Sequence, residues 1–324
     1  MIRTPLCDLL GIEHPIIQAS LGPWTSVELV AAVSNAGGLG SLGTALRPAE
    51  EHGEELAHVR ELTDRPFAVN HTTRPFDEEV FALTLKAGPK VVSFALGDPG
   101  ELVERAHDAG SLFVQQVHTV EQARRAVERG VDVIIAQGGE AGGFGGTVGA
   151  MALVPQVVDA VSPVPVVAAG GIADGRGLAA ALLLGAQGVN VGTRFLASEE
   201  TTAVGDDWKR AILAAESEDT VKVEFANEVF PPPSREGAYG TLPRTLRTPF
   251  VEEWNRRRDE AKREAGRLSG ELLAAVRQGR GHELVPFTGQ SAGMIHELLP
   301  AAEIVRRMVA ETEGASREVV DFLR

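Results

Sequence analysis

Eight short apolar runs alternate with amphipathic stretches between residues 14 and 195, and this rhythm restricts the folds open to the chain. Most of the runs are rich in valine and isoleucine and apolar almost throughout, as expected for parallel strands covered on both faces. The runs lie at 14–20, 37–43, 65–70, 90–95, 112–117, 131–137, 164–170 and 188–192. Eight units of this kind predict an α/β fold, a (β/α)8 TIM barrel, and a doubly wound open sheet is the alternative.

The stretches between the runs carry start and stop signals for helices. Thr25 or Ser26 can cap a helix that begins just after it. The stretch 119–130 begins with Thr119, and the stretch 174–186 begins with Asp174; each reaches a glycine at or near its end. These signals fit helices that connect successive parallel strands.

The rhythm breaks after the eighth run. We expect residues 1–200 to form the barrel, residues 201–290 a helical subdomain or lid, and residues 291–324 a C-terminal helix that returns to the barrel. Residues 231–249 form a proline-rich, basic loop that contains Tyr239, Arg235, Arg244 and Arg247. This loop either folds over the barrel mouth and binds an anionic substrate or lies plainly on the surface.

Charge and cysteine content exclude several classes of protein. The formal net charge of -14 disfavours nucleic acid and anionic membranes as partners. The single cysteine, Cys7, excludes an internal disulfide and a multi-cysteine metal site. Residues 1–20 contain no long apolar segment typical of a signal peptide, and no apolar run suggests a membrane span. We therefore expect a cytoplasmic enzyme with a small-molecule substrate and no metal, and the sequence is compatible with a homodimer.

The active site of such a barrel lies at the carboxyl ends of the strands. These ends are rich in amides and glycine, and Glu140 is almost the only carboxylate among them. A metal hydrolase would need several His, Asp or Glu side chains there, so the set favours a large neutral or anionic cofactor. The predicted cofactor-binding residues are Gln18, Ala19, Ser20, Asn70, Gln116, Gln137, Gly142, Gly143, Gly170, Gly171, Asn190, Val191, Gly192 and Thr193.

The last two strand ends predict a phosphate site. Gly170 and Gly171 precede the helix that Asp174 opens, and Gly192 and Thr193 end the next run. Glycine allows backbone N–H groups to point at phosphate oxygens, and a helix N-terminus adds a favourable dipole. The alternative is that these glycines serve only tight turns of the barrel. Amide side chains at the other strand ends can pair with the donor and acceptor edge of a flavin ring.

Several ordered motifs together resemble the nitronate monooxygenase family, formerly called 2-nitropropane dioxygenases. They read PIIQAS, VELVAAVSNAGGLGSLG, GVDVIIAQGGEAGGFGG, VPVVAAGGIADGRGLAAALLLGAQGVNVGTRFLAS and GQSAGMI, and they span nearly the full chain. The family also includes flavin-dependent enoyl reductases and NADH:quinone reductases. The GTRF signature also resembles inosine-monophosphate dehydrogenase, which needs a cysteine nucleophile after the phosphate motifs. Cys7 precedes the first strand, so we reject that interpretation.

The resemblance implies an FMN-binding TIM barrel with a helical second domain. By motif match, Asn70, Gln137, Gly142, Gly171 and residues 190–193 would contact FMN, and the phosphate would lie on Gly171, Gly192 and Thr193. NAD(P)H is the reductant that the reductase branch of the family implies.

The glycine-rich motif departs from the family at one position. Many members read EAGGH, with the histidine as general base beside the flavin, whereas this chain has Phe144. Phe144 shapes the pocket but cannot move a proton, which argues against base-assisted oxidation of neutral nitroalkanes. Oxidation of an already anionic nitronate needs no such base. His71, directly after Asn70, is the candidate catalytic substitute, expected to face the same cavity; the alternative is a hydrogen bond to a loop carbonyl. We interpret the other histidines, His118 included, as structural or exposed.

The sequence therefore predicts an FMN-dependent oxidoreductase, similar to nitronate monooxygenase, that oxidises a nitronate or a similar electron-rich substrate with O2. An NAD(P)H-dependent enone, enoyl or quinone reductase on the same FMN barrel is the alternative. A non-redox barrel enzyme that binds a sugar phosphate, and a protein that holds flavin without turnover, are further alternatives.

Overall fold

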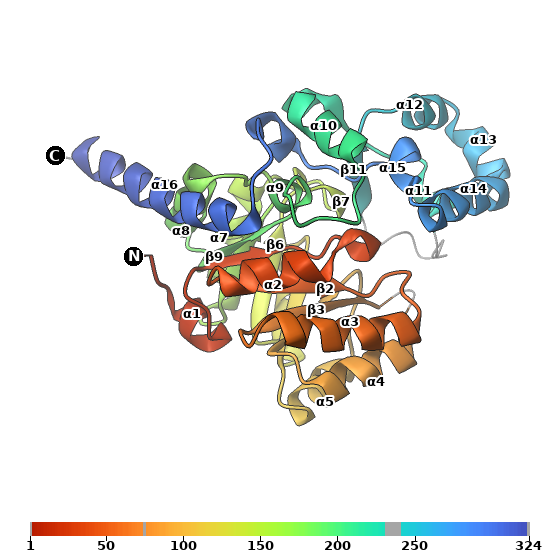
Figure 1. Cartoon of the computed structure of the whole chain (residues 1–324). Helices are drawn as coiled ribbons and strands as arrows, with labels where there is room; N and C mark the ends of the chain where they lie inside the picture. The colour runs from red at the N-terminus through yellow and green to blue at the C-terminus, as the bar shows by residue number, and fades with distance from the viewer. Residues whose placement is uncertain (1, 74–75, 231–240, 323–324) are drawn as a thin grey trace.

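The computed structural model describes residues 2–73, 76–230 and 241–322, and a parallel eight-stranded sheet forms its centre (Figure 1). The strands are β1 (Ile16–Gln18), β2 (Gly40–Gly43), β3 (Phe67–Thr72), β4 (Val91–Ala95), β5 (Leu112–Val117), β6 (Val133–Gln137), β8 (Val166–Ala169) and β9 (Gly188–Val191). Their order is β1-β9-β8-β6-β5-β4-β3-β2, and a parallel bridge between Ile17 and Leu39 joins the two ends. The predicted (β/α)8 barrel is confirmed, with a strand in each of the eight predicted runs.

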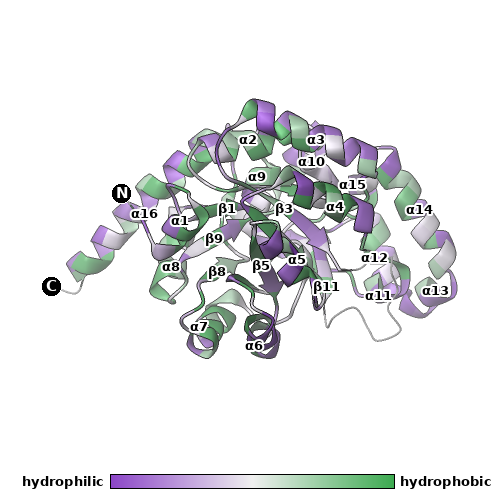
Figure 2. Cartoon of the chain, turned by 90° about the horizontal axis from the view of Figure 1, so that it is seen from below, coloured by the Kyte–Doolittle hydropathy of each residue, from purple (hydrophilic) through white to green (hydrophobic). Residues whose placement is uncertain are grey.

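Helices surround the barrel and contribute hydrophobic and hydrophilic residues to its outside (Figure 2). Within the barrel half they are α1 (Pro5–Leu10), η1 (Gly22–Trp24), α2 (Val27–Asn35), α3 (Ala49–Leu62), α4 (Glu78–Ala87), α5 (Leu102–Asp108), α6 (Val120–Glu128), α7 (Ala150–Val161), α8 (Gly175–Leu183) and α9 (Thr193–Leu196). Among the described residues, no helix combines the length and apolar character that crossing a membrane requires.

Side-chain caps start the helices where the sequence indicated. Ser26 accepts a hydrogen bond from the backbone N–H of Leu29 at the start of α2, so Ser26 rather than Thr25 is the cap. Thr119 caps α6, and Asp174 caps α8 through the backbone N–H groups of the first turn. Each cap satisfies N–H groups that the helix itself leaves free, and this fixes the direction in which the chain enters the helix.

The hydrophobic core has an outer and an inner layer. The outer layer lies between strands and helices and contains Phe81, Phe94 and Phe113. The inner layer lies inside the barrel, where helix α1 adds Leu6, Cys7 and Leu10. Cys7 is fully buried in this layer, so its thiol is a packing group.

The chain end completes the helical wall. Helix α16 (Ala301–Phe322) packs against α8 and α2, so it covers the place where the last unit of the barrel meets the first. Its buried residues are Ala301, Ile304, Val305, Met308 and Thr312. The C-terminal part of α16 projects past the barrel (Figures 1 and 2).

The lid, which we define as residues 206–230 and 241–290, lies over one end of the barrel (Figure 1). It contains α10 (Asp206–Ala214), η2 (Ser217–Asp219), β10 (Thr220–Lys222), α11 (Ala226–Val229), β11 (Leu242–Leu246), α12 (Pro249–Arg256), α13 (Arg258–Arg263), α14 (Ala265–Arg277) and α15 (Gly281–Leu284); η3 (Gln290–Met294) follows. The barrel contributes β7 (Gly143–Gly145) to the antiparallel sheet β10-β11-β7. The predicted three-part division at residues 200 and 290 stays a prediction.

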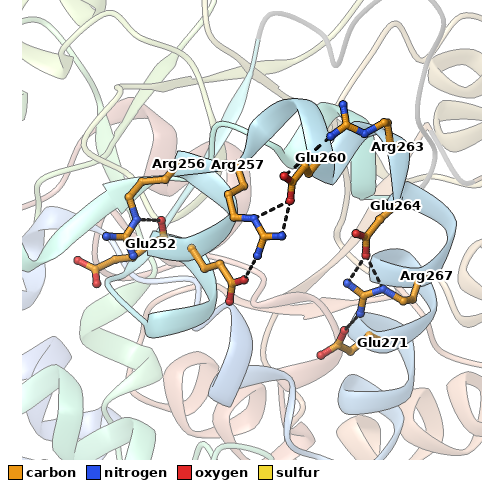
Figure 3. A network of polar contacts seen from close by, with 9 residues as sticks. Glu252, Arg256, Arg257, Glu260, Arg263, Glu264, Arg267 and Glu271 are labelled. Carbon is orange, nitrogen blue, oxygen red and sulfur yellow. Dashed lines mark hydrogen bonds and ion pairs between the residues drawn. The ribbon is translucent and has the colours of Figure 1, made fainter.

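Ion pairs connect charged side chains along the outer face of the lid helices (Figure 3). Arg257 pairs with Glu253 and Glu260, and Arg267 pairs with Glu264 and Glu271. The same two guanidinium groups lie 5.1 Å and 5.6 Å from the centre of the Trp254 ring, which belongs to the apolar core of the lid. These pairs are half exposed, so packing around Trp254 contributes more to the lid than they do.

Candidate active site

A cavity of about 360 Å³ lies between the carboxyl ends of the barrel strands and the lid. Its floor is formed by strand ends and the loops that follow them. Its roof is formed by apolar side chains of the lid, chiefly Phe230, Leu272, Leu273, Val276, Val285 and Phe287. A mostly apolar cavity with a few polar groups at one side is typical of a small-molecule site.

Most of the residues predicted from the sequence meet in this cavity. They are Ala19, Ser20, Asn70, Gln116, Gln137, Gly142, Gly143, Gly170, Gly171, Asn190, Gly192 and Thr193, together with Phe144. They come from seven loops and strands of the barrel, which the closure of the sheet brings to one end. The barrel topology therefore explains why residues so far apart in sequence lie together.

Gln18 and Val191 were predicted to belong to this set, and the structure corrects both. Gln18 is fully buried, and its side-chain oxygen accepts from the backbone N–H of Ser41 at 2.9 Å while its amide group donates to Ala19. Val191 lies in the outer core layer. Successive strand residues point to opposite faces, so Ile17 and Asn190 face the interior whereas Gln18 and Val191 face outward.

His71 does not face the cavity, so the expectation that it lies in the same cavity as Asn70 is wrong. Asn70 points into the barrel, and the next residue of β3 must point outward. The His71 ring is 3% exposed and stacks on Phe94, with Thr44 Oγ1 3.3 Å from Nδ1 and Thr84 Oγ1 3.1 Å from Nε2. The expected carbonyl partner is wrong too, because both partners are hydroxyls. Burial lowers the pKa of His71 to about 3, so the ring stays neutral.

Phe144 occupies the cavity wall beside the lid. Its ring packs edge-to-face against Phe230 and Phe287, with 5.9 Å between centroids in each pair. Among the described residues that line the cavity, none is Asp, Glu, His, Lys, Arg, Cys or Tyr. The cavity wall formed by this part of the chain therefore contains no side chain that exchanges a proton near neutral pH.

The predicted phosphate site has the backbone geometry that close approach to a ligand requires. Gly170 and Gly171 have φ angles of 100° and 72°, which L residues with side chains rarely adopt. Asp174 already accepts from the first turn of α8, at 3.0 Å from the Arg176 nitrogen. The two glycines, rather than the α8 terminus, are therefore the donors that a phosphate would meet. Thr193 Oγ1 accepts from the backbone N–H of Gly289 at 2.9 Å and keeps its own proton for a ligand.

Two amides offer opposite hydrogen-bonding groups to the cavity. Asn70 donates from Nδ2 to Ser93 Oγ at 2.9 Å, which leaves the Asn70 oxygen as an acceptor. Gln137 accepts at Oε1 from Gln116 Nε2 at 3.2 Å and lies 2.8 Å from His118 Nε2. Within the described chain, no acceptor is found for Gln137 Nε2. These two amides thus offer one acceptor, from Asn70, and one donor, from Gln137, to the cavity.

Sequence reasoning missed His118 and Lys222. His118 is 4% exposed and contacts Gln137 from behind; its place directly after a predicted strand was a usable signal. Lys222 donates to the backbone oxygens of Gly146 and Leu242 at 3.2 Å and 3.0 Å, and burial lowers the pKa of its ammonium group to about 8. Lys222 lies on a three-residue strand of the lid, which no sequence pattern announced.

The basic loop at 231–249 falls partly outside the described residues, Tyr239 and Arg235 included. Arg244 lies on β11 and donates to the backbone oxygen of Gly139 at 3.1 Å. Arg247 pairs with the exposed Glu252. Neither arginine lines the cavity, so neither is placed to bind an anionic substrate there.

No cluster of three or more His, Cys, Asp or Glu side chains suited to a metal ion is found in residues 2–73, 76–230 and 241–322. Glu140, the carboxylate at the strand ends, accepts from the backbone N–H of Ala150 at 2.9 Å. Its side chain therefore helps to begin helix α7.

Comparison with known proteins gives consistent relatives. A family model described as nitronate monooxygenase matches residues 3–311. The chain is 39% identical over 294 residues to (3aS,4S,5R,7aS)-5-hydroxy-7a-methyl-1-oxo-octahydro-1H-indene-4-carboxyl-CoA dehydrogenase of Mycobacterium tuberculosis, covering 90% of this chain and 77% of the relative. FabK from Thermotoga maritima superposes with a TM-score of 0.89, 33% identity, and coverage of 99% and 100% of the two chains. Nitroalkane oxidase from Streptomyces ansochromogenes gives a TM-score of 0.82, 30% identity, and coverage of 97% and 99%.

Proposed function

The chain belongs to the nitronate monooxygenase family and is an oxidoreductase, and from this premise we propose that it is an FMN-dependent enzyme that oxidises a nitronate or a similar electron-rich substrate with O2. The observation that carries the proposal is the cavity wall around Phe144, which has no acid or base among its described residues. A substrate that arrives as an anion needs no proton removed.

The residues of the cavity fit FMN. Gly170, Gly171 and Thr193 line the cavity and offer donors for a phosphate. The flavin edge has both donors and acceptors, which match the oxygen of Asn70 and the N–H groups of Gln137. When bound there, FMN would supply the two-electron chemistry that no side chain provides.

The protein's own part in the reaction is to position the reacting molecules and to exclude water from the cavity. The aromatic wall of Phe144, Phe230 and Phe287 keeps the space above the strand ends dry. A dry site strengthens the interactions of the few polar groups that face it. The Gln137 N–H groups and the nearby charge of Lys222 are the features that favour a negative charge in this cavity.

A reductase that uses NAD(P)H on an enone, enoyl or quinone substrate is the second candidate. The aliphatic roof from Leu272, Leu273 and Val276 favours it, because a small nitronate leaves that surface uncovered. The M. tuberculosis relative is named for a carboxyl-CoA whose bicyclic ring bears a methyl, a hydroxyl and an oxo group, so most of the ring surface is apolar.

Anaerobic mixing with candidate reductants tests the proposed function. We expect the FMN-loaded protein to be bleached by a preformed nitronate and far more slowly by NADH or NADPH. Faster bleaching by a reduced nicotinamide would favour the second candidate. Protein that is colourless when purified and does not bind added FMN would remove both.

Replacing Phe144 with histidine should add a base at the cavity wall. We expect Phe144→His to raise kcat/KM for a neutral nitroalkane at pH 8 by about a hundredfold, a usual contribution of a positioned general base. The rate with the preformed nitronate should change far less, because that substrate has no proton to lose. Steady-state oxygen consumption with each substrate measures both values.

Phe144→Leu is the matched control, since it alters the aromatic wall without adding a base. Equal gains in kcat/KM with leucine and histidine would show that space in the cavity, rather than proton transfer, limits the wild-type rate with a neutral nitroalkane. We expect the wild type to consume a neutral nitroalkane no faster than the nitroalkane itself ionises in water. Faster consumption would contradict the idea that no base serves the cavity.

A further inference from the structure

A polar cluster, buried at His118 and half-buried at Lys222, lies behind Gln137, on the side away from the cavity. It consists of His118 at the end of β5 and Lys222 on β10, and neither residue lines the cavity. His118 is 4% exposed, and its Nε2 is 2.8 Å from Gln137 Oε1. Gln116 Nε2 reaches the same oxygen at 3.2 Å. The Gln137 oxygen therefore lies between the Gln116 amide, which donates to it, and the His118 ring, while Gln137 Nε2 has no acceptor among the described residues.

Lys222 favours this direction of the amide. Gly145 has no side chain, and the point where its Cβ would stand lies 3.4 Å from Gln137 Oε1 and 3.6 Å from Lys222 Nζ. The ammonium group and the amide oxygen thus border the same small space. A positive charge attracts the oxygen end of a carboxamide and repels its N–H end. Lys222 stays charged at neutral pH, because its pKa is lowered only to about 8.

We propose that His118 and Lys222 are positioning residues that fix the Gln137 carboxamide with its oxygen buried and its N–H groups turned into the cavity. The direction of the amide is a property of the ligand-free chain. Only the identity of the ligand it meets rests on the proposed function.

The fixed donor has a consequence for a redox ligand. An N–H group binds more strongly to a ring that carries negative charge than to a neutral one. FMN gains electron density on reduction, so this donor favours the reduced form over the oxidised form. The cluster would therefore change the ratio of the affinities for reduced and oxidised FMN. It would have a smaller effect on the affinity that the two forms share.

The tautomer of His118 decides between the two possible directions. A neutral imidazole carries one N–H. With the proton on Nε2, the ring donates to the Gln137 oxygen, as proposed. The backbone oxygen of Phe144 also faces the His118 ring and is the acceptor for a proton on Nδ1. With the proton there, Nε2 accepts instead, and the carboxamide must turn its N–H groups toward His118 and its oxygen toward the cavity.

Nitrogen NMR of the ligand-free protein measures this tautomer directly. We expect the His118 ring nitrogens at pH 7.5 to show the proton on Nε2. Lys222→Met keeps the length of the side chain without its charge, and it should move the population toward the Nδ1 tautomer. A predominant Nδ1 tautomer in the wild type would overturn the proposal.

Binding of FMN gives the second measurement. We expect His118→Phe to weaken binding of reduced FMN about tenfold more than binding of oxidised FMN, which lowers the two-electron midpoint potential by about 30 mV. His118→Gln retains a donor near the position of Nε2 and should restore the wild-type ratio. His52→Phe removes another buried histidine, one that bonds Thr84 instead, and should leave the ratio unchanged.

Equal shifts in His118→Phe and His52→Phe would overturn the proposal, because they would trace the effect to general loosening of the core. A wild type that binds no FMN would remove the proposed function alone, since the His118 tautomer is read without any ligand. The two ideas therefore fail separately.

Discussion

Replacing Gly171 with valine is expected to weaken FMN binding at least hundredfold, about 2.7 kcal/mol. Gly171 has a φ angle of 72°, which a β-branched residue does not adopt without strain, and it lines the cavity at the predicted phosphate site. The new Cβ would also contact the Glu140 side chain at 3.6 Å. The turn would move, and its backbone N–H groups would no longer point at a phosphate. Titration of the ligand-free protein with FMN, followed by flavin fluorescence, measures the loss.

Gly88→Val is the matched control for this substitution. Gly88 ends helix α4 with a φ angle of 59°, and a Cβ there would have no atom within 4 Å. Both variants carry the strain of a left-handed residue, so both should lose some stability. Only Gly171→Val should lose affinity for FMN. Comparable losses of FMN in the two variants would show that global stability, rather than the phosphate site, had been changed.

Acidification from pH 7 to pH 5 is expected to lower the free energy of unfolding by about 3 kcal/mol through two buried histidines. His52 and His71 share Thr84 Oγ1, at 2.8 Å and 3.1 Å from their Nε2 atoms. Burial lowers their pKa values to about 4 and about 3, and the nearby Arg47 lowers that of His52 further. The neutral rings fit the site, and a protonated ring would be a charge in the core.

The sign follows from the direction of both shifts. In the unfolded chain the two rings take up protons near pH 6.5, whereas in the folded chain they do not until about pH 4 and pH 3. The contribution to stability is thus complete above pH 6.5 and is lost as the pH falls below it. The pKa of His118 is also lowered by burial, so His118 acts in the same direction. Carboxylates add little to this loss of stability above pH 5, because their pKa values in the unfolded chain lie below 5.

Urea unfolding at the two pH values checks this expectation. The double variant His52→Gln, His71→Gln should lose most of the difference between pH 7 and pH 5, even where its stability at pH 7 is lower. His58→Gln alters an exposed histidine and should keep the full difference. An unchanged difference in the double variant would show that other groups cause the loss in acid.

The strands of the barrel could be predicted because each is a continuous apolar run, and the loops of the cavity could be predicted because they follow those runs. The errors at Gln18, His71 and Val191 have one cause. Adjacent strand residues cannot both face the interior, so the sequence itself excluded His71 once Asn70 was assigned to the cavity. The prediction used the position of each strand end but not the alternation along the strand.

The lid side of the site was beyond prediction for another reason. Strand β7 pairs with β11, about a hundred residues further along the chain, and neither strand is a continuous apolar run. Lys222 reaches the cavity region only through this pairing. Contacts that depend on three-residue strands leave no trace in hydrophobic periodicity. His118, by contrast, could have been placed by the same rule that placed Gln116.

The position of α16 has a consequence for the order in which the protein is made. This helix covers the seam between α8 and α2, and its buried residues Ile304, Val305 and Met308 are synthesised long after both helices. Until they emerge, the first and last units of the barrel have an uncovered apolar face where they meet. The nascent chain would thus need protection from aggregation until α16 has emerged and packed against both helices.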